Sequence, residues 1–455
     1  MAEAVFLIYV ATVMVMGVKA KAKTLETFIL GDVLDTKTMV ATIVSTFYGA
    51  SAILGGVSLT YQLGLDVIWF MVPFYLGNVA IILLLKRIAS SERCTLPGFL
   101  GDFYGNGFAV ASSMLLVTLC LVPEEIIAGG KILSLFTSMP VEAAMGAMTF
   151  VLVVPVAIGG MKADVITDIA QFALMLIMLG VMVLFLGHTG RLGLQPDLDS
   201  GVPPGHLTLC SSLSLQEIAV FFVSFFFLPI TSAPLYLRFF ASESEACSRK
   251  SVLSSVAIWM VVDAIIVLCG FAALRMFPNL DDPDMSFVLL GMAMPPVGRG
   301  VFTIGLLAAI MSTVNSFLQS GASSLAHDAF RHFMPGTSDR RLLALSRVFV
   351  IVLGLLSLAL ALWFQMIVPA LLFTLSMWTA GVLVPTLAAL SGVRLRKRSA
   401  WASLAAGTLS CLAWQMAQPF QVDALFVGLG CSVLAALISE VLPGRAQGAQ
   451  RTAPW

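Results

Sequence analysis

Long apolar runs separated by short polar segments dominate this chain. A hydrocarbon core of about 30 Å requires roughly 20 apolar residues per spanning helix, and runs of that length recur from end to end. Irregular backbone cannot face lipid and no barrel-like alternation is visible, so the pattern predicts an all-α polytopic membrane protein. We expect about thirteen transmembrane helices, near residues 2–18, 38–57, 63–85, 107–137, 141–158, 163–187, 215–237, 251–274, 298–330, 342–363, 366–391, 400–418 and 422–442.

These spans predict a single transmembrane transporter domain over residues 1–445, followed by a short cytoplasmic tail at 446–455. Spans two to six and seven to eleven are two sets of five, at about 38–187 and 215–391. Because five is odd, the second set begins from the opposite side of the membrane. Inverted five-helix repeats are a recurrent transporter architecture. The N-terminus lacks a basic segment before the first span and a clear small-residue cleavage site, so we interpret this span as retained rather than as a signal peptide.

Composition and charge agree with this class. Only 11% of residues are charged and 59% are hydrophobic, whereas a soluble domain carries about 25% charged residues. The net charge of zero gives no indication of nucleic-acid binding. With the N-terminus outside, 21 of the 25 Lys and Arg residues fall in cytoplasmic loops and three fall outside. The positive-inside rule therefore predicts an integral plasma (inner) membrane protein with an outside N-terminus and a cytoplasmic C-terminus.

Catalytic chemistry has no support in the sequence. The seven cysteines form no CxxC pair, and the four histidines show no metal-ligand spacing. No HExxH, GxSxG or clustered His/Asp motif is present. We therefore expect neither an enzyme nor a catalytic metal.

The first helix of each five-helix set contains helix-breaking residues. These are Phe47 to Ser51 (FYGAS) in the first set and Pro229 to Pro234 (PITSAP) in the second. A proline removes a helix hydrogen bond and frees a carbonyl, and hard cations such as sodium prefer oxygen ligands. The alternative is simple kinking, since Gly and Pro are common in membrane helices.

The ninth predicted span carries a polar stripe after the apolar run Val301–Met311. The steps are mostly three and four residues, so its members share one helix face. In the predicted topology this face occupies the cytoplasmic half of the span. It should line protein or a water path, and helix packing through Ser hydrogen bonds is the alternative. The stripe comprises Ser312, Asn315, Ser316, Gln319, Ser320, Ser323, Ser324 and His327.

The same span resembles a known family. GLLAAIMSTVNSFLQSGASSLAHD (Gly305 to Asp328) looks like a motif of the sodium/solute symporter family, whose members include proline, pantothenate, sialic acid and glucose carriers. GGMKADVITDIAQ (Gly159 to Gln171), PLYLRFFA (Pro234 to Ala241) and LETFILG (Leu25 to Gly31) are similar to three other family segments. The resemblance covers roughly residues 22–390. It implies a LeuT-like fold and sodium-coupled symport of a small organic solute by alternating access.

Site residues follow from the resemblance, position by position. It implies a main sodium site made by the Ala309 carbonyl, the Ser312 and Thr313 hydroxyls, and the carbonyls of Ser45 and Tyr48. Some family members bind a second sodium ion. Its ligands here would be Asp168, Ser312, Asn315 and Ser316.

The chain departs from the family at two places. Asp32 stands where a basic residue is usual. Phe47 and Tyr48 stand where sugar and proline carriers place polar or acidic side chains, which argues against a sugar or proline substrate.

Ionisable residues within spans are costly and usually functional. Glu124 or Asp263 would face the solute cavity and bind a cationic or amine group. The alternative is an internal contact between Glu124 and Lys131, seven residues later on the same helix face, or side chains that extend to a protein cavity without binding solute. Further solute-site candidates, chosen by depth in the predicted spans, are Ser51, Thr231, Ser232, Thr374 and Trp378.

Two alternatives remain within this fold. One is proton coupling at the glutamates, and the other is a sensor-type (transport-receptor) protein. The tail after residue 442 is too short for a signalling domain, which argues against the sensor. We expect Na+, a small organic solute and the lipid bilayer as partners, and neither nucleic acid nor a protein partner.

Overall fold

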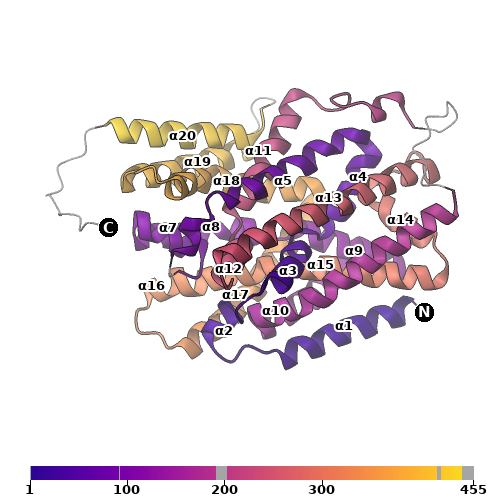
Figure 1. Ribbon diagram of the computed structural model, residues 1–455, viewed down its shortest axis with the longest axis horizontal. Coiled ribbons are helices and arrows are strands. Elements are labelled where there is room, and N and C mark those ends of the chain that lie inside the picture. The colour runs from indigo at the N-terminus through magenta and orange to yellow at the C-terminus, as the bar shows by residue number, and fades with distance from the viewer. Residues whose placement is uncertain (1, 92, 191–201, 418–421, 443–455) are drawn as a thin grey trace.

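The computed structural model describes residues 2–91, 93–190, 202–417 and 422–442 as a bundle of helices (Figure 1). The predicted tail at 446–455 lies outside these ranges. Within them, the extended backbone pairs at one isolated parallel bridge, between Leu34 and Ser242. The all-α prediction is therefore confirmed for the described chain.

The helices follow one another with short connections. The first part contains α1 (Ala2–Lys19), α2 (Leu25–Ile29), α3 (Thr36–Phe47), α4 (Ala50–Leu63), η1 (Gly64–Val67), α5 (Ile68–Ile82), α6 (Leu85–Ala89), α7 (Leu96–Tyr104), α8 (Asn106–Cys120), α9 (Pro123–Thr137) and α10 (Val141–His188). The second part contains η2 (Pro204–Leu207), α11 (Leu215–Thr231), α12 (Ala233–Phe240), α13 (Glu245–Met276), η3 (Pro283–Met285), α14 (Ser286–Met292), α15 (Pro296–Ser324), η4 (Leu325–Phe330), α16 (Arg331–Phe333), α17 (Asp339–Phe364), α18 (Ile367–Ser391), α19 (Lys397–Ala417) and α20 (Ala424–Val441).

Nine helical stretches of the described chain are long and apolar enough to cross a membrane. They do not correspond one to one with the thirteen predicted spans. The stretch α10, for example, contains two of them, and its backbone breaks at Gly160 (φ 68°, ψ −168°) between predicted spans 141–158 and 163–187. The number of spans and the repeat boundaries stay predictions.

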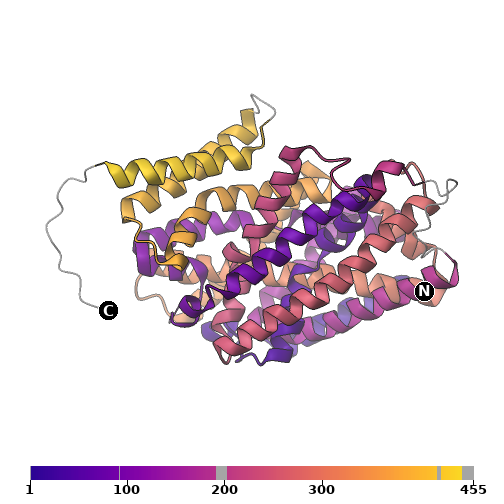
Figure 2. The same cartoon turned by 45° about the horizontal axis from the view of Figure 1, so that its top comes forward.

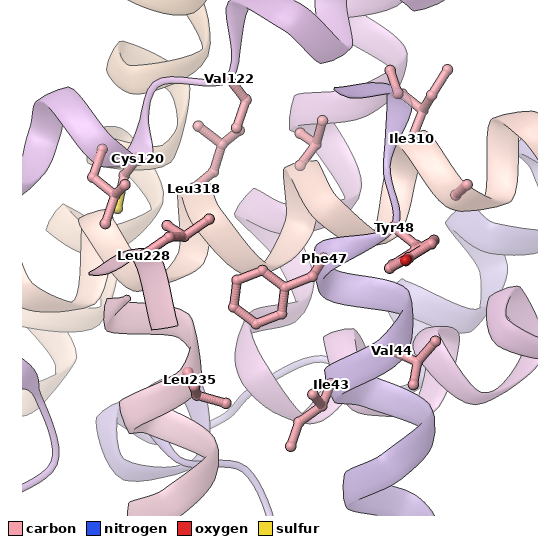
Figure 3. Packing of buried hydrophobic residues seen from close by; sticks show 14 of the residues in the cluster. Ile43, Val44, Phe47, Tyr48, Cys120, Val122, Leu228, Leu235, Ile310 and Leu318 are labelled. Carbon is pink, nitrogen blue, oxygen red and sulfur yellow. The ribbon is translucent and has the colours of Figure 1, made fainter. Parts of the chain in front are cut away.

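The helix predicted at 38–57 is interrupted. The helix α3 ends at Phe47, Tyr48 has φ −110° and ψ 57°, and α4 resumes at Ala50. Figure 3 shows Phe47 and Tyr48 at this break, directed to opposite sides of the chain. The predicted interruption is confirmed, and it leaves backbone groups without helix partners in the interior.

Two further breaks occur. Ser232, with extended backbone, separates α11 from α12 as predicted. The predicted span 107–137 corresponds to one span-capable stretch, Asn106–Leu135, which is interrupted where Leu121 and Val122 separate α8 from α9. The cause is Pro123, which lacks an N–H and disfavours helical backbone in the residue before it. The Val122 N–H instead donates to Ser357 Oγ at 3.0 Å.

The segments next to the two broken helices are tied together at one end of the bundle. The Leu34 N–H donates to the Ala241 carbonyl at 2.8 Å, and the Glu243 N–H donates to the Leu34 carbonyl at 3.2 Å. Asp35 then begins α3 by accepting from Thr38, and these hydrogen bonds lower its pKa. The start of α3 and the end of α12 are thereby held in register.

The outer helices complete the bundle. Figures 1 and 2 show α20 at one edge, packed on α19, in both views. The broken helix α3 packs against α10, α13 and α15 in the interior. Functional groups on these three helices therefore surround the break.

Replacing Gly160 by alanine tests the break in α10. Gly160 has a positive φ, and a Cβ there would overlap Phe28, so we expect G160A to lower the free energy of unfolding by about 1–2 kcal/mol or more. The measurement is thermal unfolding of the purified protein in detergent. Gly180 on the same helix has open space around it, so G180A serves as the control and should be neutral or slightly stabilising. Equal melting of the two variants would contradict the strained geometry at Gly160.

Candidate functional site

Three oxygen atoms converge where α3 ends. The Ser312 hydroxyl of α15 lies 2.7 Å from the Ser45 carbonyl oxygen and 2.9 Å from the Ala309 carbonyl oxygen. The last carbonyls of a helix have no intrahelical partner, so the Ser45 carbonyl is open to Ser312. All three residues are buried. The arrangement presents neutral oxygen ligands of the kind that sodium prefers.

Thr313 joins this oxygen cluster from the same turn of α15. Its hydroxyl lies 3.4 Å from the Ala309 carbonyl oxygen. A Cβ added at Gly49 would overlap both this hydroxyl and the Glu125 carboxylate, so both groups lie directly against the break. Tyr48, the other predicted carbonyl ligand, is the residue between α3 and Gly49. The five residues predicted for the main sodium site therefore come from the two segments that meet at the break.

The other side of the break exposes the N-terminus of α4. Both carboxylate oxygens of Glu125 accept from the Ala50 N–H, at 2.9 and 2.7 Å. Glu125 is fully buried and comes from the first turn of α9. Because a helix N-terminus carries partial positive charge, the carboxylate satisfies this end of α4.

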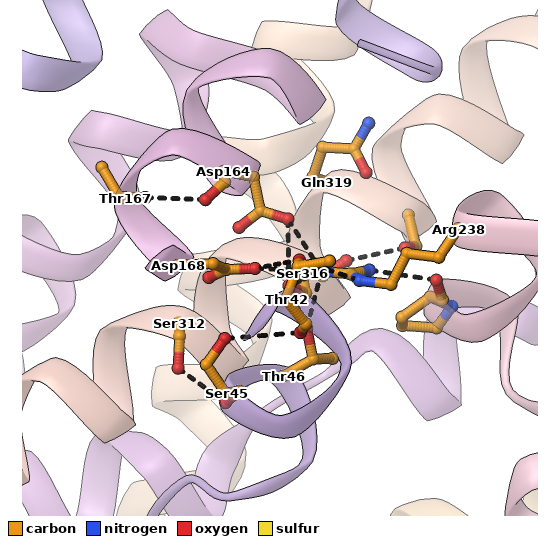
Figure 4. Close-up of polar contacts among 12 residues, drawn as sticks. Thr42, Ser45, Thr46, Asp164, Thr167, Asp168, Arg238, Ser312, Ser316 and Gln319 are labelled. Carbon is orange, nitrogen blue, oxygen red and sulfur yellow. Dashed lines mark hydrogen bonds and ion pairs between the residues drawn. The ribbon is translucent and has the colours of Figure 1, made fainter. Parts of the chain in front are cut away.

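Arg238 organises a second polar cluster beside the oxygen cluster (Figure 4). Its guanidinium is fully buried and lies 3.3 Å from Asp164 Oδ2 and 3.2 Å from Asp168 Oδ2. It also donates to Ser316 Oγ at 2.7 Å. Two hydroxyls of α3 complete the cluster, from Thr42 at 2.8 Å and Thr46 at 2.6 Å. One cation thus links α3, α10, α12 and α15.

The four residues predicted for a second sodium ion have different partners in the described chain. Asp168 and Ser316 contact Arg238, whereas Ser312 contacts the Ser45 carbonyl. Asn315 lines a separate small cavity with Asp164, between α1, α10 and α15. The resemblance alone did not place the guanidinium among these ligands.

The remainder of the polar stripe faces protein. Gln319 Nε2 donates to the Phe28 carbonyl of α2 at 2.6 Å and to Ser323 Oγ at 3.0 Å. Ser320 donates to the Ser316 carbonyl of its own helix at 2.7 Å. These side chains are buried, so this half of the stripe packs helices together in the described structure.

A cavity adjoins the Arg238 cluster. Its volume is about 70 Å³, so a solute larger than a few atoms would require the surrounding side chains to move. Thr46 belongs to both features, because it lines the cavity and accepts from Arg238. Thr313 likewise lines the cavity and adjoins the oxygen cluster. Aromatic side chains form much of the wall: Phe47, Tyr48, Phe70, Phe74, Phe225 and Phe317.

Two carboxylates also line this cavity. Glu124 is 4% exposed, and its Oε2 has no hydrogen-bond partner within the described chain. Asp263 is 6% exposed and accepts from the Tyr75 hydroxyl. No Lys, Arg or His appears among the described residues that line the cavity. The wall is therefore apolar and acidic.

The alternative contact between Glu124 and Lys131 is wrong. Lys131 Nζ lies 2.7 Å from Asp282 Oδ2 and 3.0 Å from Asp284 Oδ2. These aspartates precede α14 in a connecting segment, and sequence periodicity within one helix gives no information about such a partner. The Lys131 charge is therefore compensated away from Glu124.

Four of the seven predicted solute-site residues line the cavity: Ser51, Glu124, Asp263 and Thr374. The other three lie at the second break. Trp378 Nε1 donates to the Thr231 carbonyl at 2.9 Å, and Ser232 is the residue between α11 and α12. Trp378 therefore satisfies a carbonyl freed by that break.

Sequence reasoning missed Tyr75 and most of the aromatic wall. Phe70, Phe74 and Tyr75 lie on α5, and Phe225 lies on α11. In an almost wholly apolar span, the sequence has no alternation of polar and apolar positions to indicate which aromatic side chain faces a cavity. The one signal available was the spacing of Phe70 and Phe74, four residues apart and so on one helix face.

Comparison with known proteins supplies independent information. A model of the sodium:solute symporter family matches residues 28–407. The high-affinity proline transporter PutP of Bacillus subtilis (strain 168) is 26% identical over 325 residues, covering 66% of this chain and 67% of that protein. The sodium/pantothenate symporter of Escherichia coli (strain K12) is 25% identical over 341 residues, covering 71% and 70%. The alignments span about two thirds of these relatives.

Solved structures match over more of the chain. The substrate-bound outward-open state of a Na+-coupled sialic acid symporter superposes with a TM-score of 0.77 at 14% identity, covering 98% of both chains. MhsT in complex with L-phenylalanine superposes with a TM-score of 0.53 at 13% identity, covering 89% of this chain and 97% of that one. At these identities the similarity concerns the fold.

Removing the Arg238 guanidinium tests the polar cluster. The R238M variant leaves Asp164 and Asp168 buried without their cation, so we expect a loss of about 3–5 kcal/mol of stability. Thermal unfolding in detergent measures this loss, and adding D164N and D168N should restore much of it. R249M is the matched control, since Arg249 is exposed and its pair with Glu245 spans one helical turn, worth about 0.5 kcal/mol or less. An R238M protein that melted like the unmodified chain would rule out the cluster.

Proposed function

The chain belongs to the sodium:solute symporter family, and we propose that it uses the oxygen cluster at the α3 break to couple sodium influx to solute uptake. It has the LeuT-like fold of the solved transporters that it resembles, as expected. Family and relatives are transporters rather than enzymes, and Na+ is their coupling ion. The convergence of Ser312 with the Ser45 and Ala309 carbonyls is the observation that carries the proposal.

The proposed sodium ion sits among the oxygens of Ser45, Tyr48, Ala309, Ser312 and Thr313. It would take the place of the hydrogen bonds that Ser312 makes to the two carbonyls. Unwound carbonyls and half-helix ends perform this role in transporters with discontinuous helices. Sodium binding would thereby hold the end of α3 against α15.

In this proposal, sodium binding is coupled to solute binding through residues that the oxygen cluster and the cavity share. Thr313 belongs to the oxygen cluster and also lines the cavity. Gly49 lies against Thr313 at the break from which α4 and the cavity wall begin. An ion that fixes α3 against α15 therefore fixes one wall of the solute cavity. We propose that solute binds best when sodium holds this wall in place.

The energy available is sufficient for accumulation. One charge crossing 100 mV releases about 2.3 kcal/mol, and a tenfold sodium gradient adds about 1.4 kcal/mol. Together these correspond to roughly 500-fold accumulation of a neutral solute for each sodium ion. A single ion is thus enough to drive uptake.

Orientation comes from the distribution of basic residues. Lys19, Lys23 and Lys162 lie at the end of the bundle where α1, α2 and the α10 break meet. Since basic residues favour the cytoplasmic side, we propose that this end faces the cytoplasm and that the N-terminus lies outside. The Arg238 cluster would then form the cytoplasmic closure beneath the cavity.

Substituting the two hydroxyl ligands tests the sodium site. We expect S312A and T313A each to raise the sodium concentration for half-maximal effect about tenfold or more, because each removes an oxygen from a buried cation. The readout is sodium-induced thermal stabilisation, which needs no knowledge of the solute. S320A is the control, since that hydroxyl only returns to its own helix backbone. Wild-type sodium response in both S312A and T313A would refute the site.

Stoichiometry gives a second test. Arg238 contacts Asp168 and Ser316, so a second ion there would have to displace the guanidinium. We therefore expect one sodium per transport cycle and a Hill coefficient of about 1 for sodium. Sodium binding to the purified protein measures this directly. A value near 2 that falls to 1 in N315A would show instead that the second site is filled.

A further inference from the structure

We propose that the transported solute is a small organic cation, an amine or quaternary ammonium on an apolar body. The inference rests on the proposed function, because it assigns a substrate class to the cavity beside the oxygen cluster. Three independent observations lead to it: the capped N-terminus of α4, the two carboxylates of the wall, and the aromatic lining.

The first observation concerns the place where an anionic solute would bind. In transporters with discontinuous helices, half-helix N-termini point at anionic groups of the substrate. Here the N-terminus of α4 is already occupied, since Glu125 holds the Ala50 N–H with both carboxylate oxygens. A solute carboxylate would have to replace a buried side chain of the same charge. The Glu125 carboxylate thus already occupies the N-terminus of α4, where the carboxylate of an anionic solute would bind.

The second observation is the unpaired acid in the wall. Glu124 is almost fully buried, lines the cavity, and has one carboxylate oxygen without a partner in the described chain. Asp263 on α13 lines the same cavity and is held by Tyr75. An ionised carboxylate in such surroundings is costly unless a positive charge approaches it. A cationic solute provides that charge during transport.

The nearby basic residues do not supply it. Lys131 is engaged by Asp282 and Asp284. Arg238 is paired with Asp164 and Asp168 and is not among the residues that line the cavity. Among the described residues, no basic side chain therefore pairs with the cavity carboxylates, and a cationic solute would supply the missing positive charge.

The third observation is the shape and chemistry of the wall. Six aromatic side chains line the cavity, and several meet edge to face, as Phe70 does with Phe225 at 4.4 Å between ring centroids. Cations are attracted to aromatic faces, and organic ammonium groups are recognised in this way. Sugars and other polyhydroxylated solutes need many hydrogen-bond partners, whereas most of the residues that line this cavity are apolar.

A series of matched probes tests the proposal. Benzylamine and benzyltrimethylammonium are cations, benzyl alcohol is neutral and benzoate is anionic, on one common ring. Binding to the purified full chain is measured by calorimetry with sodium present. We expect at least one cation to bind about tenfold or more tightly than benzyl alcohol, and benzoate to bind most weakly. Benzoate binding as tightly as the cations would overturn the proposal, as would the failure of both cations to bind.

Variants of the two cavity carboxylates then test whether these side chains cause the preference for cations. E124Q and D263N should each reduce cation affinity about tenfold while leaving benzyl alcohol unaffected. E142Q is the control, since Glu142 is exposed at the start of α10. If both cavity variants kept the full preference for cations, the assignment to these carboxylates would fail. A change in the pH dependence of sodium-driven transport with unaltered selectivity would show that the carboxylates carry protons instead.

The sodium response separates this inference from the proposed function. Sodium-induced stabilisation without any solute should persist in E124Q and D263N and be weakened in S312A. If sodium stabilises the unmodified chain but the probes show no preference for cations, only the substrate class is wrong. If sodium has no effect on the unmodified chain, the proposed function itself fails.

Discussion

The structure depends on one constraint, the interruption of α3 within a membrane-embedded bundle. Lipid offers no hydrogen-bond partners, so backbone groups released by a break must be satisfied inside the protein. Ser312 meets the Ser45 carbonyl on one side, and Glu125 meets the Ala50 N–H on the other. These two side chains come from α15 and α9, so an irregularity in one helix fixes the positions of two others. The polar side chains that hydrogen-bond to the broken backbone also line the proposed functional site.

Charge is distributed around this break in a definite order. A carboxylate caps α4, two more face the cavity, and a guanidinium holds two aspartates beside it. Buried charges are stable only when they are paired and hydrogen-bonded. Arg238 meets that condition fully, whereas Glu124 does not. Glu124, which has no cation beside it, lies in the cavity, where a transported molecule approaches, whereas the aspartates paired with Arg238 lie where helices must stay together.

Much of this arrangement could be predicted from the sequence. The breaks at Phe47–Ser51 and at Ser232 follow from local Gly and Pro chemistry, and Ser312 and Thr313 follow from a motif. The position of Arg238, the partners of Lys131 and the break before Pro123 could not be predicted in the same way. The first two are contacts between residues far apart in sequence, which depend on helix rotation and depth that hydropathy does not report. The third had a local signal in Pro123, followed by Glu124 and Glu125, but the apolar runs before and after these residues together predict one span.

The Arg238 cluster has a consequence for the tightness of the closed protein. Five side chains from three helices bind a single guanidinium: Thr42, Thr46, Asp164, Asp168 and Ser316. Separating any one of these helices leaves the buried guanidinium with an incomplete set of acceptors, so we expect the contacts to be lost together rather than one at a time. A partly opened path, through which ions would slip without solute, is therefore disfavoured. In such a transporter, efficient coupling would then depend less on how strongly the ion binds than on how rarely ions cross without solute.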